Sequence, residues 1–267
     1  MPRRHITSYS NPTVKALRSL REKKHRQRER RFLAEGLRLL TDARESGRVP
    51  DTLVMSEKRE PHPLLDALES AVDDAGGDII ETTPDILSKI TGKDNPQGVA
   101  GAFAEWDTGL DRLERDAAPI WLVAQALRDP GNLGTMLRTG DAVGAGGLIL
   151  IDDCADPFGV EAVRASMGAI FTQQLARARW DDFLRWLSGG SGQLVAASLR
   201  DAVPYRSAPY SAPCFVLVGN ESQGLPQDYE DACDLRVTMP MRGRADSLNA
   251  AVAAAVLSYE VLASLES

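Results

Sequence analysis

Disulfide pairs, metal-binding spacings and membrane-length apolar runs are all missing from this sequence. Its 267 residues contain only three cysteines, Cys154, Cys214 and Cys233, with no CxxC spacing. An odd count without that spacing suits a reducing compartment and argues against zinc, so we expect no metal. No run of about 18 apolar residues occurs, and the N-terminus lacks the apolar core of a secretory signal. These absences predict a cytoplasmic protein with no membrane segment, whose cysteines pack as small apolar residues.

Positive charge is scarce overall but concentrated at one end. The formal net charge is −7, yet residues 1–31 hold eleven Lys and Arg against two Glu. The basic run Lys23–Arg31 has two interpretations: a solvated helix face or disordered tail, or a surface that contacts phosphates. Nucleic-acid binding depends on a local patch rather than on the net charge, so the acidic total does not exclude it.

Alternating strand and helix patterns divide the chain into two α/β segments. We expect a basic extension at 1–30 that begins with a flexible arm, a first segment at 31–104, a charged linker at 105–118 and a second segment at 119–267. In the first segment the patterns predict strands at 53–55, 79–80 and 97–104, and helices at 32–47, 63–75 and after Thr83.

The second segment is predicted to form a parallel sheet covered by helices. Its patterns predict strands at 119–124, 148–151, 193–198, 214–218 and 235–238, and helices at 129–143, 157–167 and 247–264. The last helix is apolar nearly all round, so we expect it to be largely buried. A glycine cluster at 140–147, followed by Asp152, suggests a dinucleotide site of an NAD-dependent oxidoreductase. However, its order is helix, glycines, strand, which is typical of a helix C-cap instead.

Three polar motifs follow strands of the second segment. The first, Asn132-Leu-Gly-Thr-Met-Leu-Arg138, opens a helix; alone, Arg138 could simply pair with Asp141 on the surface. The second, Gly219-Asn-Glu-Ser-Gln-Gly224, places Glu221 at a strand end, where ligands bind in α/β folds, although Glu221 could also cap a helix.

The third motif, Met239-Pro-Met-Arg-Gly-Arg-Ala-Asp-Ser-Leu-Asn249, leads into the last helix. Ser247 or Asp246 could serve only as the helix N-cap, an interpretation that holds whatever the function. That interpretation leaves Asn249 unexplained, because its neighbours are all Ala, Leu and Val.

With these motifs in this order, the sequence resembles the SpoU/TrmH family of RNA 2′-O-ribose methyltransferases, in the SPOUT superfamily. The resemblance is close over 119–265, and 31–104 resembles the family's L30e-like substrate-binding domain. Ser222 follows Glu221 where many relatives have Gly, and Arg242 and Arg244 add charge to the third motif. Neither departure removes a group that the family uses.

The resemblance implies a deep trefoil knot in the C-terminal parallel sheet and S-adenosylmethionine as the methyl donor. It implies that the donor is bound by Gly219, Asn220, Gly224, Met239, Met241, Gly243 and Leu248. The catalytic group would consist of Arg138, Asn132, Glu221, Ser247 and Asn249. In the family Arg138 would be the base, although a guanidinium with a pKa above about 12 could instead stabilise the developing alkoxide.

The resemblance further implies a homodimer with the site across the interface, and an RNA substrate. We expect ribosomal RNA (23S) rather than transfer RNA, because the L30e-like fold also occurs in ribosomal proteins. A non-catalytic RNA-binding module is the alternative. If the basic run at the N-terminus contacts phosphates, deleting residues 1–31 should weaken RNA binding and flatten its salt dependence.

Overall fold

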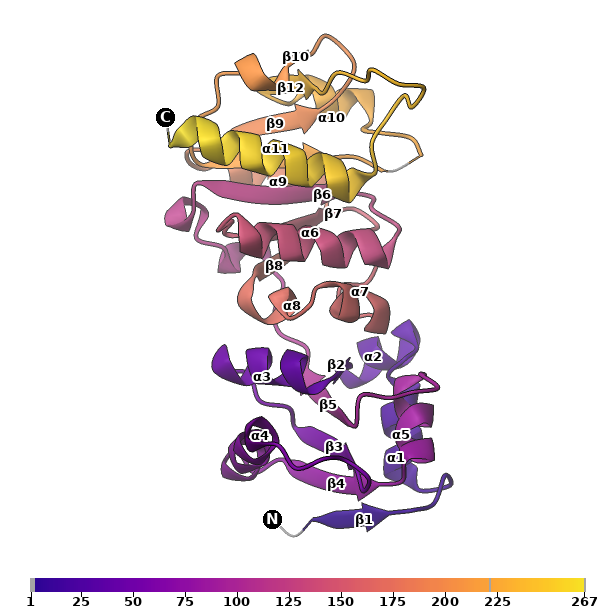
Figure 1. The fold of residues 1–267 in the computed structure, drawn as a ribbon. Helices are drawn as coiled ribbons and strands as arrows, with labels where there is room; N and C mark the ends of the chain where they lie inside the picture. The colour runs from indigo at the N-terminus through magenta and orange to yellow at the C-terminus, as the bar shows by residue number, and fades with distance from the viewer. Residues whose placement is uncertain (1–2, 221, 267) are drawn as a thin grey trace. The chain divides into compact units, whose positions relative to one another are not determined.

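A computed structural model describes residues 3–220 and 222–266 as two α/β units (Figure 1). Unit 1 comprises Met1–Trp106 and Asp156–Thr172, and unit 2 comprises Asp107–Ala155 and Gln173–Ser267. The two α/β units confirm the predicted fold class, whereas the knot stays a prediction. Within the described residues, no helix is both long and apolar enough to cross a membrane.

Unit 1 is built on a mixed five-stranded sheet. Its strands, in spatial order, are β1 (Arg4–Ile6), β4 (Asp78–Thr82), β3 (Thr52–Ser56), β5 (Val99–Ala104) and β2 (Arg31–Glu35). Strands β1, β4 and β3 run parallel, and β5 is antiparallel to its neighbours β3 and β2. The helices are α1 (Pro12–Ser19), α2 (Lys23–Glu29), α3 (Leu37–Glu45), α4 (Pro63–Asp74), α5 (Pro84–Thr91), α7 (Val160–Ala165) and α8 (Ala169–Thr172).

Two local predictions in unit 1 are wrong. The expected flexible arm contains β1, which pairs with β4, and the Thr82 hydroxyl donates a hydrogen bond to the Ile6 carbonyl at 2.6 Å. Residues 31–35 were predicted partly as helix but form β2, because pairing with β5 overrides the local pattern. Helix α3 starts only after Gly36, whose φ of +109° interrupts the strand.

The basic N-terminal residues are part of unit 1 rather than a separate tail. Val14, Leu17 and Leu20 lie in the same buried cluster as Ile86 and Ile90 of α5. Helix α1 is therefore held by the same apolar burial that stabilises the rest of the unit.

Residues 156–172 also pack in unit 1, although they fall between strands of unit 2 in the sequence. Phe158 and Phe171 join Phe32, Phe103 and Trp106 in one aromatic cluster. Two ion pairs reinforce this packing. Buried Arg26 bonds Asp156 at 2.7 Å, and Arg164 bonds the largely buried Glu35 at 2.8 Å.

Unit 2 is built on a wholly parallel seven-stranded sheet. The strand order is β10 (Val203–Pro204), β12 (Leu235–Thr238), β9 (Gln193–Ala197), β11 (Cys214–Val218), β6 (Ile120–Gln125), β7 (Gly147–Ile151) and β8 (Gln174–Ala178). Its helices are α6 (Pro130–Ala142), α9 (Trp180–Ser188), α10 (Gln227–Asp231) and α11 (Ala250–Leu265), and short 3₁₀ turns occur at Leu110–Arg112, Arg115–Ala117 and Tyr205–Ser207.

Helices α6 and α11 lie side by side on one face of this sheet (Figure 1). Strand residues alternate between faces, so Trp121, Phe215 and Leu217 point instead toward α9, where Phe183 and Leu187 cover them. Because all strands are parallel, the loops after β9, β11 and β12 meet at one edge of the sheet, which is where α/β folds usually bind ligands.

Candidate active site

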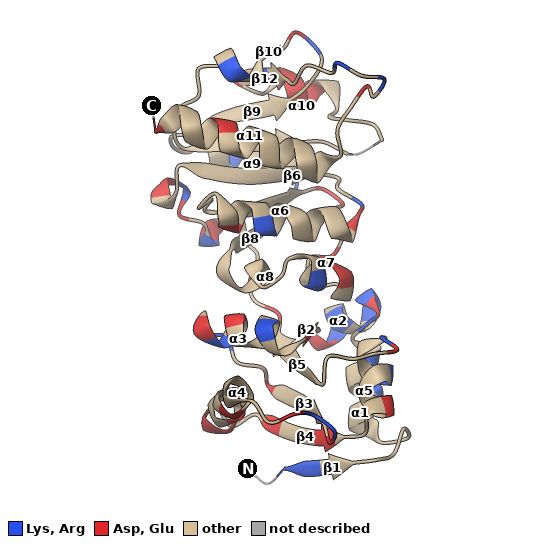
Figure 2. Cartoon of the chain, in the orientation of Figure 1, with Lys and Arg blue, Asp and Glu red and all other residues tan. Residues whose placement is uncertain are grey.

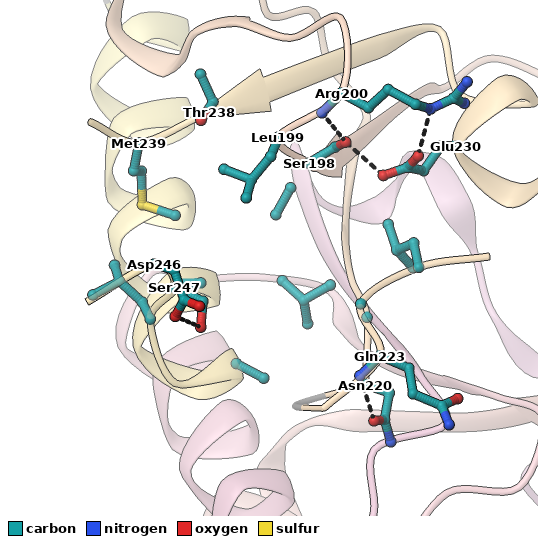
Figure 3. A pocket seen from close by; sticks show the side chains of 18 of the residues that line it. Ser198, Leu199, Arg200, Asn220, Gln223, Glu230, Thr238, Met239, Asp246 and Ser247 are labelled. Carbon is teal, nitrogen blue, oxygen red and sulfur yellow. Dashed lines mark hydrogen bonds and ion pairs between the residues drawn. The ribbon is translucent and has the colours of Figure 1, made fainter. Parts of the chain in front are cut away.

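A cavity of about 420 Å³ opens at the carboxyl ends of β9, β11 and β12. Figure 3 shows its lining, with Met239, Asp246 and Ser247 on one side and Asn220 and Gln223 on another. The apolar part of the lining consists of Ala197, Leu199, Val218, Leu225, Val237, Met239, Met241, Leu248, Ala250 and Ala253. Its size and its mixture of apolar walls with a few polar groups are typical of small-molecule sites.

The loop after β11 is shaped by two glycines. A Cβ atom on Gly219 would lie 2.5 Å from the backbone carbon of Gly224, and Gly224 itself has a φ of +69°. Asn220 stabilises this loop: its Oδ1 accepts hydrogen bonds from the backbone of Ser222 and Gln223, and its Nδ2 donates to the Ala126 carbonyl at 2.8 Å. Glu221, predicted to be catalytic, lies outside the described residues.

One wall of the cavity is a charged network that the sequence patterns did not predict. The Ser198 hydroxyl and Arg200 Nε both donate to Glu230, the latter at 2.9 Å, and Arg200 also bonds Asp231. Hydrogen bonds to Asp231 and Glu230 raise the pKa of Arg200 above its ordinary value. The polar residues Ser198 and Arg200, directly after β9, could have indicated a site at this strand end. Their partner Glu230 could not be identified, because it lies about thirty positions further along the chain.

The loop from β12 to α11 forms the opposite wall. Met239, Met241, Ser247 and Leu248 line the larger cavity, and Gly243 lines a neighbouring cavity of about 280 Å³. The Ser247 hydroxyl lies 3.4 Å from an oxygen of Asp246. Asp246 also lines the larger cavity, and its carboxylate adds a negative group there that suits a cationic ligand.

The N-cap of α11 is Asn249, not Ser247 or Asp246 as expected. Asn249 Oδ1 accepts hydrogen bonds from the Ala251 and Val252 amides, and α11 begins at Ala250. Its Nδ2 donates to Asn132 Oδ1 at 2.9 Å, so one side chain both starts α11 and joins it to α6. The helix starts later than predicted because Ser247 and Leu248 remain in the loop that lines the cavity.

The prediction that α11 is largely buried is wrong for one of its faces. Ala254, Leu257 and Val261 are buried, but Val252, Val256 and Tyr259 are 47%, 36% and 54% exposed. We refer to these three exposed side chains as the α11 stripe.

Helix α6 carries the first motif. Asp129 caps it by accepting a hydrogen bond from the Asn132 amide at 2.6 Å. Arg138 is exposed, and its guanidinium forms no hydrogen bond or ion pair with any residue of 3–220 and 222–266. Six residues at 1.5 Å each place it about 9 Å along the helix from Asn132. Arg138 is not among the residues that line the larger cavity.

Residues 119–259 match the SpoU rRNA Methylase family, and residues 11–101 match the MRM3-like substrate binding domain. The chain belongs to the SpoU rRNA Methylase family. Over 259 residues, covering 97% of this chain and 99% of the relative, it is 32% identical to the 23S rRNA (guanosine(2553)-2′-O)-methyltransferase RlmP of Bacillus subtilis.

Solved structures give the same family. An AdoMet-bound rRNA methyltransferase from Sinorhizobium meliloti is 39% identical, with a TM-score of 0.93 and 99% of each chain covered. The SpoU methyltransferase AviRb from Streptomyces viridochromogenes, in complex with AdoMet, is 28% identical, with a TM-score of 0.84, covering 96% of this chain and 99% of that one.

In this SpoU-family chain, the predicted donor-binding residues lie together. Gly219, Asn220, Gly224, Met239, Met241 and Leu248 line the larger cavity, together with Ser247 from the predicted catalytic set. Asn132 and Asn249 form a hydrogen-bonded pair at the helix starts, while Arg138 lies further along α6. Within the described residues, no group of three or more His, Cys, Asp or Glu side chains could hold a metal ion.

Proposed function

We propose that this SpoU-family protein transfers a methyl group from S-adenosylmethionine to a ribose 2′-hydroxyl of structured RNA. The observation that carries the proposal is the cavity where three strand ends meet, in a chain whose relatives include a 23S rRNA 2′-O-methyltransferase. The reaction forms a bond between the 2′ oxygen and the methyl carbon. It breaks the bond from carbon to sulfonium sulfur and releases the hydroxyl proton.

The cavity fits the proposed donor in size and chemistry. About 420 Å³ falls within the range of small-molecule sites, and backbone groups of the loops at Gly219 and Met239 can read a neutral adenine between apolar walls. Asp246 is a negative group suited to the positive sulfonium or amino group. When bound, S-adenosylmethionine would supply an electrophilic methyl group to this site.

We assign the handling of the acceptor hydroxyl to Arg138, Asn132, Glu221, Ser247 and Asn249. Because a guanidinium keeps its proton below about pH 12, Arg138 would act as a cation that orients the neighbouring phosphate and stabilises the developing alkoxide. The bond between Asn249 and Asn132 would hold the starts of α6 and α11 in register beside the cavity.

We propose that the active form is a homodimer with the site built across the interface. Arg138 does not line the larger cavity of its own chain, so an Arg138 that acts there would come from a second copy. The α11 stripe offers an apolar surface for such an association.

Ribosomal RNA, with 23S rRNA first, is the substrate class that we propose, and transfer RNA is the second candidate. The RlmP relative, which is nearly the same length, acts by its name on 23S rRNA. We accordingly place the reaction in the cytoplasm. A non-catalytic RNA-binding module is not favoured, because it would have no need for the cavity or for the exposed Arg138.

Calorimetry and a methyl-transfer assay test the proposal. We expect S-adenosylmethionine to bind and NAD not to bind, and radiolabelled methyl groups to enter transcribed 23S rRNA as 2′-O-methyl nucleotides. Arg138→Ala should abolish transfer while leaving donor affinity unchanged. If the wild-type protein binds no S-adenosylmethionine, the proposed function is wrong; if Arg138→Ala loses donor binding as well, its role is structural.

A further inference from the structure

We infer that Arg242 and Arg244, on the loop between β12 and α11, bind the RNA phosphates that flank the target nucleotide. This inference rests on the proposed function and extends it, because it names a surface of this chain that positions the substrate.

Among the described residues, several arginines of unit 2 are paired with neighbouring acids, whereas Arg138, Arg179 and Arg206 are exposed without one. Arg112 bonds Asp107 at 2.9 Å, Arg185 bonds Asp182 at 2.9 Å, and Arg236 bonds Asp231 at 3.1 Å. Such pairs leave little net charge for a polyanion to use.

Arg242 and Arg244 belong to the arginines that have no acidic partner among the residues that the structure describes. Both are exposed, and neither forms a hydrogen bond or ion pair with any residue of 3–220 and 222–266. The nearest acid in the sequence is Asp246. Its carboxylate lies 3.4 Å from the Ser247 hydroxyl and forms no ion pair with either arginine. Figure 2 shows basic residues along this loop. Within the described part of the chain, the loop therefore keeps two uncompensated guanidinium groups.

The loop lies beside the larger cavity, so its two guanidinium groups are placed where RNA phosphates would lie. Met239, Met241 and Leu248 of the same loop line the larger cavity, and Arg242 lines the adjoining smaller one. A ribose whose 2′-hydroxyl reaches the larger cavity carries a phosphate on each side, so phosphates must lie near its mouth. Guanidinium groups suit them, because their planar donors match phosphate oxygens. Moreover, a chain with a net charge of −7 needs local cations to offset its repulsion of RNA.

The double variant Arg242→Gln, Arg244→Gln tests the inference. The matched control is Arg179→Gln, Arg185→Gln, which removes the same charge from exposed positions at the start of α9 and within it. We would measure binding to in vitro transcribed 23S rRNA across a salt series, donor affinity by calorimetry, and oligomeric state by size exclusion.

The test variant should bind RNA roughly tenfold more weakly near 0.15 M salt, and its log–log salt slope should fall by about 1.4, at about 0.7 per phosphate contact. Donor affinity and oligomeric state should match the wild type, and Arg242→Lys, Arg244→Lys should recover most of the salt slope. The control variant should change the slope much less.

An equal change in the control, or a parallel loss of donor affinity or of oligomeric state, would overturn the inference. RNA binding is measured without methyl transfer. A wild-type protein that binds RNA but not S-adenosylmethionine would therefore reject the proposed function. The salt slope of the double variant would still decide whether Arg242 and Arg244 bind RNA phosphates.

Discussion

At the scale of single residues, Asn249 has two structural roles, because it caps α11 and also links this helix to α6. Its Oδ1 caps α11, and its Nδ2 bonds Asn132. The pattern correctly marked Asn249 as an unexplained polar residue among Ala, Leu and Val. It could not reveal the partner, because Asn132 lies 117 positions away and only the packing of α6 on α11 brings them together.

Two substitutions separate these roles. Asn249→Ala removes cap and donor, so we expect it to lose about 1 kcal/mol of stability, as is usual for a lost N-cap, together with methyl transfer. Asn249→Asp keeps an oxygen for the cap but lacks the donor, so it should keep stability and still lose activity. Urea unfolding and the methyl-transfer assay measure the two effects. Full activity in Asn249→Asp would show that the bond to Asn132 is dispensable.

At the scale of helices and strands, periodic patterns predicted most of the framework. Strands β3, β7, β9, β11 and β12 occur where expected, and helices α6 and α5 begin directly after Asp129 and Thr83, close to their predicted starts. Strand β8 and helix α9 were not predicted, although Trp180, Phe183 and Leu187 recur at the spacing of one helix face. The aromatic packing of Phe158 and Phe171 in unit 1 had no local signal, since their partners lie far away in the sequence.

Helices α1 and α2 refine the prediction for the basic N-terminus. Deleting residues 1–31 would expose the cluster around Ile86 and Ile90, because Val14, Leu17 and Leu20 belong to it. Weak RNA binding by that truncation would thus have two possible causes. Arg26 should also be kept, because it is buried against Asp156.

The surface formed by α1 and α2, which Figure 2 shows as basic along α2, can be tested more cleanly. The test replaces only those Lys and Arg side chains that form no ion pair. Lys15, Arg18, Lys23 and Lys24 are exposed, and their side chains form no hydrogen bond or ion pair with the residues that the structure describes. Replacing all four by Gln should leave thermal stability nearly unchanged, weaken 23S rRNA binding and reduce its salt slope. As a control that removes the same charge, Arg4, Arg44, Arg112 and Arg185 could be replaced by Gln instead, since each forms an ion pair with an acid. An unchanged slope in the fourfold variant would exclude this surface from RNA binding.

The α11 stripe yields a prediction about assembly. A charge placed at Val256 would have to be buried in the proposed dimer, which is costly without a partner. We expect Val256→Asp to give a monomer in analytical ultracentrifugation while retaining its helical circular dichroism. Leu64→Asp, at a similarly exposed apolar position on α4, should leave the oligomeric state unchanged. A wild-type protein that is already monomeric would contradict the proposed dimer.

At the scale of the whole molecule, the proposed activity depends on which chain supplies Arg138. Two variants that are inactive for different reasons can decide this. Arg138→Ala should keep the donor cavity, whereas Gly219→Val should distort it, because even a Cβ atom there meets the backbone of Gly224. Each variant alone should be inactive but folded and dimeric.

Mixing the two variants under conditions that exchange subunits distinguishes a shared site from a self-contained one. In a heterodimer with shared sites, the intact cavity of one chain meets the intact Arg138 of the other, which restores one of two sites. Random exchange makes half of the dimers mixed, so about a quarter of wild-type methyl transfer should return. If each chain used its own Arg138, no site in the mixture would be complete. Activity that stays at the level of the separate variants, after mass spectrometry has verified exchange, would therefore place the whole reaction within one chain.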